Sequence, residues 1–229
     1  MVRLVRILTI VVIGAKLAGC SSALSWDPGY HVVESGDTIY SIAFRYDVDQ
    51  RALMAWNGID NAALIRVGQR LRLSPPSGSS GAAPPPRSAG SSRSTKPQST
   101  PSQPAQSVRW QWPSDGAVIA VYGSSTKTRS GIQIGGKQGQ PVRAASGGRI
   151  VYAGTALAGY GHLLIIKHNN DYLSAYGHND RLLVKEGDQV AAGQRIADMG
   201  IGPGKRPLLH FEIRLRGEPV NPVGYLPKR

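Results

Sequence analysis

The sequence of 229 residues contains one cysteine, few acidic residues and no long apolar run. A single cysteine excludes an internal disulfide framework and a cysteine-rich zinc module. No apolar run reaches the roughly 18–20 residues that a spanning helix needs, so a multi-pass membrane protein is excluded. The length allows one or two ordinary domains, and the 28 glycines and 16 prolines indicate many turns and at least one disordered segment.

Acidic residues are outnumbered, with 14 Asp and Glu against 27 Lys and Arg, which gives a net charge of +13. The excess is uneven, because residues 26–74 carry 5 basic and 6 acidic groups whereas residues 109–229 carry 16 and 8. Such a balance fits nucleic acid, an anionic cell-wall polymer or a membrane surface as a partner. The N-terminal segment argues for a cell-wall or membrane partner and against nucleic acid.

The first twenty residues have the layout of a secretory signal, in which two arginines precede the apolar residues 7–15 and small residues follow. Nine residues at about 1.5 Å each cannot cross a hydrocarbon core of roughly 30 Å, so we do not expect a permanent anchor helix. The tetrad Leu17-Ala18-Gly19-Cys20 resembles a bacterial lipobox, although Lys16 departs mildly from that pattern. The alternative is a short buried helix with a chance cysteine.

The lipobox resemblance implies that residues 1–19 are a lipoprotein signal peptide and that Cys20 carries a diacylglyceryl group. Residues 20–29 would then be a lipidated tether. Ser21 after the cysteine resembles lipoproteins sorted to the outer membrane, facing the periplasm. In that compartment we do not expect a nucleic-acid partner.

Residues 75–108 separate two candidate modules and are rich in Pro, Ser and Gly, with almost no large apolar side chain and no acidic residue. Such a stretch cannot bury enough surface to offset the entropy of ordering, so we predict a disordered and partly extended linker. Its three cations could contact anionic lipid or polymer, or could be part of a solvated spacer.

The sequence of the first module, residues 30–74, predicts a strand, two short helices and a closing strand. Asp37 is the expected N-cap of the first helix. The second helix is expected over Asp49–Trp56 and ends at an Asn-Gly turn signal, and residues 68–73 alternate apolar and charged side chains as a strand does.

Three segments of this module resemble a LysM domain: Tyr30–Ala43, Asn57–Gly58 and Val67–Leu71. The resemblance implies a βααβ fold that binds N-acetylglucosamine-containing glycans, chiefly peptidoglycan. It places the sugar groove between the first strand–helix loop and the loop that follows the second helix and continues to Ile65. The glycan-binding candidates are therefore Gly36, Asp37, Thr38, Asn57, Gly58 and Ile59. Asp37 and Thr38 could instead serve only as helix caps.

The second module, residues 109–229, is expected to be mainly β because short Val- and Ile-rich runs are bounded by Gly or Asp. The predicted strands are Val118–Tyr122, Gly148–Ala153, His162–His168, Tyr172–Tyr176, Gln194–Asp198 and Leu208–Leu215. The module resembles the lysostaphin/LytM-type zinc endopeptidases in five segments: Gly139–Ile150, Gly159–Gly161, Tyr176–His178, Val184–Gln194 and Leu209–Ile213.

That resemblance implies a zinc site made by a His-x-x-x-Asp loop and the second histidine of a His-x-His strand, with further histidines for catalysis. In this sequence the first two ligand positions are Arg129 and Gln133, and the His-x-His position reads Leu208-Leu209-His210. His178 keeps the remaining catalytic position. A guanidinium cannot be deprotonated to bind a cation and adds positive charge. We therefore predict a degenerate domain with no catalytic residues, no metal and no cofactor.

The remaining histidines have less specific interpretations. His178 and His210 could line the degenerate groove or simply form hydrogen bonds there, and two imidazoles alone make at most an adventitious metal site. His168 is expected to be a structural residue at a strand end. His162 has no ligand spacing, and nothing in the sequence places Asp180 or Glu212 in the groove.

The combination of lipobox, LysM domain, linker and degenerate LytM domain resembles the NlpD-like murein hydrolase activators. The resemblance implies that the groove at Arg129, Gln133, His178, Leu208 and His210 binds a periplasmic N-acetylmuramoyl-L-alanine amidase and activates it for septal wall cleavage. Two alternatives stay open. One is a purely structural tether between outer membrane and peptidoglycan, and the other is a residual zinc endopeptidase.

Overall fold

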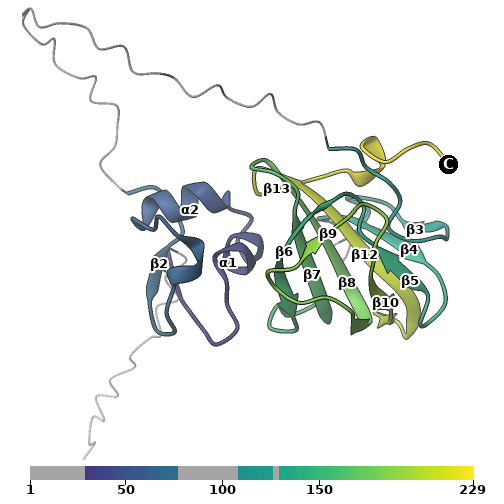
Figure 1. Ribbon diagram of the computed structural model, residues 1–229, viewed down its shortest axis with the longest axis horizontal. Coiled ribbons are helices and arrows are strands. Elements are labelled where there is room, and N and C mark those ends of the chain that lie inside the picture. Colours follow the sequence, from purple (N-terminus) through teal and green to yellow (C-terminus); the bar gives the residue numbers. More distant parts are fainter. Residues whose placement is uncertain (1–28, 77–107, 126–128) are drawn as a thin grey trace, which may run out of the picture.

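The computed structural model describes residues 29–76, 108–125 and 129–229, which form two modules (Figure 1). We call residues 29–76 the N-terminal module and the other two ranges the C-terminal module. The predicted signal peptide, Cys20 and nearly all of the predicted linker lie outside the described residues. In the described ranges no helix is both long and apolar enough to span a membrane.

The N-terminal module has the predicted βααβ order. Its two strands, β1 (Tyr30–Val32) and β2 (Arg70–Arg72), pair antiparallel and are separated in sequence by α1 (Ile39–Arg45), α2 (Gln50–Trp56) and a 3₁₀ turn, η1 (Ala62–Leu64). Helices of seven residues are too short to be stable alone, so their buried faces must hold them. Those faces are fully buried at Ile39, Ile42 and Leu53.

Helix α1 is capped by Thr38 and not, as the sequence led us to predict, by Asp37. The Thr38 hydroxyl accepts a hydrogen bond from the Ser41 backbone and the Ser41 hydroxyl accepts one from the Thr38 backbone, a reciprocal capping box. The Asp37 carboxylate turns inward instead, 2.7 Å from the His31 ring and 3.3 Å from Arg45, and is 1% exposed. Pairing with two basic groups explains why this acid is buried and does not cap the helix.

The C-terminal module is built on one 11-stranded antiparallel sheet. Its main path is β3 (Val118–Ala120), β4 (Ile132–Gly135), β12 (Arg206–Leu215), β8 (Tyr172–Leu182), β7 (His162–Lys167), β6 (Gly148–Gly154) and β9 (Gln189–Val190). The remaining elements are β10 (Arg195–Met199), which pairs with β5 (Pro141–Arg143) and β8, then β11 (Ile201–Gly202) and β13 (Glu218–Val220), which pair with β12, and the 3₁₀ turn η2 (Pro222–Gly224).

All six strands predicted from the sequence are present, as β3, β6, β7, β8, β10 and β12. Strand β8 continues past the predicted end at Tyr176 to Leu182 and so carries His178 within the sheet. The sequence analysis missed β4, β5, β9, β11 and β13, which have two to four residues each.

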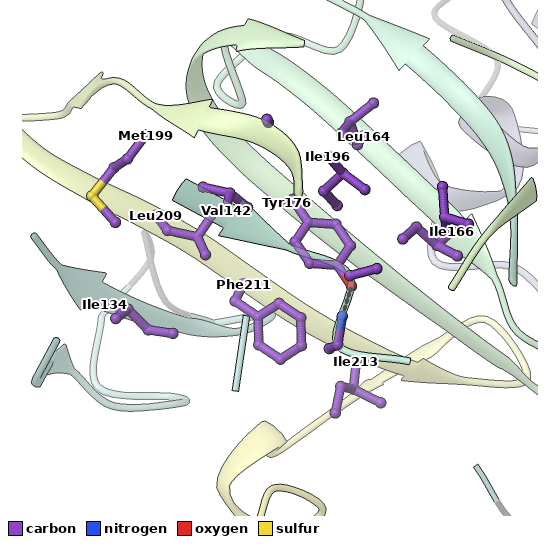
Figure 2. Close-up of a cluster of buried hydrophobic side chains, with 14 of the residues drawn as sticks. Ile134, Val142, Leu164, Ile166, Tyr176, Ile196, Met199, Leu209, Phe211 and Ile213 are labelled. Carbon is purple, nitrogen blue, oxygen red and sulfur yellow. Dashed lines mark hydrogen bonds between the residues drawn. The ribbon is translucent and has the colours of Figure 1, made fainter. Parts of the chain in front are cut away.

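One face of the sheet, which we call the core face, is apolar and forms the interior of the C-terminal module (Figure 2). Tyr176 and Phe211 lie at its centre with ring centroids 5.4 Å apart. The Tyr176 hydroxyl accepts a hydrogen bond from the Ala145 backbone at 2.8 Å, so its polar atom is satisfied in the interior. The surrounding side chains are Ile132, Ile134, Leu164, Ile166, Leu209 and Ile213.

The structure confirms that His168 is a structural residue just beyond β7. Its Nδ1 lies 2.8 Å from the Gly147 carbonyl oxygen and its Nε2 lies 2.7 Å from the Ser174 hydroxyl. Burial lowers the pKa of His168 to about 4, although the hydrogen bond to Gly147 acts in the opposite direction. The ring is therefore neutral at neutral pH and links the residue before β6 to strand β8.

The opposite face, which we call the docking face, packs against the N-terminal module. Phe44 projects from α1 into a cluster on this face and is 2% exposed. Burying a side chain of this size contributes about 2–3 kcal/mol. In Figure 1, α1 is the helix of the N-terminal module that lies next to β6 and β7. The cluster around Phe44 consists of Val151, Tyr152, Leu157, Leu163, Ile165, Leu173 and Ala175.

Two further contacts join the modules outside the Phe44 cluster. Arg51 forms an ion pair of 3.3 Å with Asp171 on the far side, but Arg51 is half-exposed, so this pair contributes little. Gly217, with φ +88°, is required by the close approach, since a Cβ atom there would lie 2.6 Å from the backbone of Val48 and Asp49. The modules are thus closely packed at this interface.

Candidate functional site

The candidate site is organised by alternate residues of β12. Because successive side chains of a strand point to opposite faces, His210, Glu212 and Arg214 all lie on the docking face. His210 pairs in register with Gln133 of β4 and with Gly177 of β8, in the middle of the sheet. All three side chains on β12 are buried, at 4%, 0% and 2% exposure.

Glu212 joins these side chains into one hydrogen-bonded network. Its Oε1 accepts from His210 Nε2 at 2.9 Å and from the Tyr160 hydroxyl at 2.8 Å, and its Oε2 accepts from Arg214 Nε at 2.9 Å. Burial alone would raise the pKa of Glu212, but the hydrogen bond from His210 and the charge of Arg214 outweigh it and lower the pKa below its ordinary value. The carboxylate is therefore ionised and fully partnered.

Arg214 extends the network into the N-terminal module. Its Nη1 donates to the Phe44 carbonyl oxygen at 2.9 Å and to Asp47 Oδ1 at 2.7 Å. The guanidinium carbon lies 3.6 Å from the centroid of the Phe44 ring, a cation–π contact. A continuous chain of contacts therefore runs from Asp47 through Arg214 and Glu212 to His210.

His178 lies beside the end of this chain. Its ring centroid is 6.2 Å from that of His210 and its backbone has φ +62°, a left-handed conformation that is uncommon for a residue with a side chain. The backbone N–H of His178 donates to the Tyr160 carbonyl oxygen at 2.7 Å, which holds this conformation. Burial, and to a smaller extent the neighbouring His210, lower the pKa of His178 to about 4, so the ring is neutral at neutral pH.

The other three predicted groove residues differ in accessibility. Arg129 is exposed in the loop before β4, and Gln133 is partly exposed on β4 opposite His210. Leu208 is 2% exposed, and a Cβ atom at Gly202 of β11 would lie 2.7 Å from it. Its side chain is therefore covered by β11 and contributes to the floor of the site.

These residues do not fit a zinc ion. At the three positions that the lysostaphin/LytM resemblance gives to ligands, only His210 is an imidazole, and its Nε2 donates to Glu212. Arg129 is a permanent cation and the Gln133 amide is a weak neutral donor. Within the part of the chain that the structure describes, no group of three His, Cys, Asp or Glu residues is placed to hold a metal.

The predicted glycan-binding residues form two loops of the N-terminal module. Besides the buried Asp37, Asn57 is used internally, because its amide donates to the Leu53 and Arg72 carbonyls and accepts from the Arg72 backbone. Gly36 and Gly58 have positive φ values of +86° and +61° and shape the loops. Thr38 caps α1, and Ile59 is partly buried against the module's core.

Comparison with known proteins identifies both modules. Residues 31–74 match the family model described as "LysM domain", and residues 127–222 match "Peptidase family M23". A protein named "Lipoprotein NlpD/LppB homolog" from Pseudomonas aeruginosa is 45% identical over 235 residues, covering 88% of this chain and 78% of that protein. The chain belongs to the NlpD-like family of LysM–M23 lipoproteins.

Other members of the NlpD-like family align over different extents. The "Uncharacterized lipoprotein YgeR" of Escherichia coli is 38% identical and is covered over 92% of its length. The "Murein hydrolase activator NlpD" of E. coli is 55% identical over 120 residues, which are 52% of this chain but 32% of that protein. Lysostaphin from Staphylococcus simulans, a solved structure, is 29% identical with a TM-score of 0.47 over 52% of each chain.

The sequence analysis of this NlpD-like chain missed the residues that link the modules. No motif in the sequence gives a site role to Phe44, Asp47, Tyr160, Glu212 or Arg214, although the structure joins them in one network. The signal available was the alternation of His210, Glu212 and Arg214, which puts three polar residues on one face of an otherwise apolar strand. Such a polar row on a buried strand indicates a network or an interface.

Proposed function

We propose that this NlpD-like lipoprotein is a non-catalytic activator of a periplasmic N-acetylmuramoyl-L-alanine amidase, which cleaves septal peptidoglycan during cell separation. In this proposal a lipid on Cys20 holds the chain at the outer membrane, facing the periplasm, and the LysM module binds peptidoglycan. The observation that carries the proposal is the replacement of zinc ligands by Arg129 and Gln133 in an otherwise M23-like sheet.

The chemistry of the site supports a role without catalysis. Zinc hydrolysis needs three protein ligands and an open position for a water molecule whose pKa the metal lowers. Of the corresponding residues only His210 could ligate, and its hydrogen bond to Glu212 gives it a structural role. The names of the relatives, murein hydrolase activators, support the same conclusion.

The amidase would bind the groove that an active enzyme uses for its substrate. Arg129, Gln133 and His178 offer exposed or partly exposed side chains, with His210 and Leu208 beneath them. A neutral His178 can both donate and accept a hydrogen bond. The excess of basic residues in the C-terminal module could steer an acidic surface of the amidase toward the groove.

The N-terminal module would concentrate the activator on its substrate. The loops at Gly36–Thr38 and Asn57–Ile59 would form the glycan groove, with Asp37 and Asn57 contributing mainly through the backbone because their side chains are bonded internally. Holding the activator on the wall raises its effective concentration near a wall-bound amidase.

The direct test is release of dye from labelled sacculi by soluble residues 22–229, alone and with each candidate amidase. We expect no release by the protein alone and strong release with at least one amidase. Release by the protein alone would identify a residual endopeptidase, and measurement of bound zinc would confirm it. Binding to sacculi without release in any combination would identify a structural tether between outer membrane and wall.

A further inference from the structure

A cleft of about 570 Å³ lies between the two modules, away from the degenerate peptidase groove. Its N-terminal wall is made by Thr38, Tyr40 and residues 61–63, and its C-terminal wall includes Arg149, Lys167 and Glu186. Thr38 also donates from Oγ1 to the Val151 carbonyl oxygen at 3.4 Å, which joins the two walls at the base of the cleft. The cleft therefore exists only while the modules are docked.

The N-terminal wall adjoins the residues proposed above for glycan binding and shares Thr38 with them. Thr38 belongs to the first loop, and residues 61–63 belong to the second, between α2 and β2. Asn61 and Ala63 are exposed, and the side-chain oxygen of Asn61 accepts a hydrogen bond from the Ala63 backbone and so caps η1. A glycan bound to these loops would lie against the C-terminal module.

The C-terminal wall carries a net positive charge. Arg149 and Lys167 come from neighbouring strands, at paired positions of β6 and β7. Among the described residues neither cation has a carboxylate within 4 Å, although Glu186 is close enough to Arg149 for their charges to interact. Lys167 Nζ donates to the Tyr40 hydroxyl at 3.4 Å and lies 5.4 Å from the Tyr40 ring centroid. The cations are thus held at the cleft and available to an anion.

We propose that this cleft is a composite peptidoglycan site, in which the N-terminal wall binds the glycan and Arg149 and Lys167 bind carboxylates of the attached stem peptide. The proposal rests on the wall-binding role given above and adds a second module to it. A neutral chitin-like glycan offers no anion to the two cations, whereas murein carries peptide carboxylates on alternate sugars. Charge-assisted hydrogen bonds to these carboxylates would make the docked protein selective for murein.

The proposal is tested by calorimetric titration of residues 22–229 with two probes of equal glycan length, one uncharged and one charged. One is chitotetraose, and the other is a murein tetrasaccharide with free stem carboxylates. We expect the wild type to bind the murein fragment at least tenfold more tightly. The double variant Arg149→Met/Lys167→Met should lose at least tenfold for murein only, because even one charge-assisted hydrogen bond is worth roughly that factor.

Two controls separate this proposal from the proposed function. Methionine keeps the aliphatic packing of Lys167 on Tyr40, and the matched variant Arg206→Ala/Lys228→Ala removes two exposed cations outside the cleft and should change neither affinity. Unchanged murein affinity in the cleft variant, or an equal loss for both probes, would overturn the composite site. Failure of the wild type to bind either probe would instead overturn wall binding by the LysM module itself.

Discussion

Neighbouring residues of β12 point to opposite faces of one sheet and meet opposite environments. Phe211 and Ile213 enter the apolar core face, whereas Glu212 and Arg214 form a buried ion pair on the docking face. The core face needs only residues of its own module. On the docking face, Arg214 is satisfied by Glu212 and by Asp47 and Phe44 of the other module. The docking face therefore depends on the N-terminal module to bury its apolar side chains and to pair its charges, whereas the core face does not.

The largest expected effect comes from breaking the ion pair on the docking face. Arg214→Ala leaves Glu212 charged and buried without its guanidinium partner, so we expect a loss of about 3–5 kcal/mol in the free energy of unfolding. Urea unfolding of the soluble chain measures it. The double variant Glu212→Leu/Arg214→Met should recover much of the loss, since it leaves no buried charge unpaired and the Asp47 side chain, 38% exposed, can be hydrated. If the double variant were as unstable as Arg214→Ala, the loss would come from packing.

Removing the Phe44 side chain should uncouple the unfolding of the two modules. Phe44→Ala deletes an aromatic ring buried at 2% exposure, and we expect about 3 kcal/mol less docking free energy. Calorimetry should then resolve two unfolding transitions, one for each module, in place of a coupled one. Leu64→Ala, which truncates a side chain of the same module at 69% exposure, is the matched control and should leave the transition unchanged. Coupled unfolding in both variants would contradict the docking model.

Acid should weaken the fold through the buried His168. Its pKa is about 4 in the folded protein and about 6.5 in the unfolded chain, so the unfolded chain binds more protons between these values. Stability is therefore complete above pH 6.5 and falls by at most about 3 kcal/mol as the pH drops to 4. Unfolding titrations at several pH values measure this slope.

His168→Gln should reduce that slope, leaving the contribution of His178, which has a similarly lowered pKa. The matched variant His162→Gln replaces an exposed ring and should leave the slope unchanged. An equal slope in the wild type and in His168→Gln would mean that another group carries the acid sensitivity.

The smallest effect on stability is expected at the rim of the groove. Arg129 is exposed before β4, so Arg129→Asp should change the free energy of unfolding by no more than about 0.5 kcal/mol. The same variant should reduce amidase activation in the dye-release assay while binding to sacculi persists. Normal activation by Arg129→Asp and also by His210→Ala would argue against the groove as the partner site.

The local order of elements could be predicted because it depends on local patterns. The alternation of Val and Ile between Gly and Asp residues predicted six strands of the sheet, and cap and turn signals predicted both helices. Strands β4 and β5 were missed because three or four residues carry little periodicity, whereas β3, with three residues, was found because the apolar run Val118–Tyr122 is longer than the strand. The cap was misassigned because Asp37 and Thr38 are both good N-cap residues, and only the partners His31 and Arg45 decide between them.

The two modules and their families can be identified from the sequence alone, because they depend on residue identity at recognisable motifs, and the same motifs place Arg129 and Gln133 where the lysostaphin/LytM resemblance implies zinc ligands. The tertiary structure is needed to show that the modules pack together and that Arg214 contacts Phe44, 170 positions away. It also places Leu208 under β11 and a charged cleft beside the loops for which we propose glycan binding. Such contacts depend on how two folded surfaces fit, and no local pattern in a single sequence records that fit.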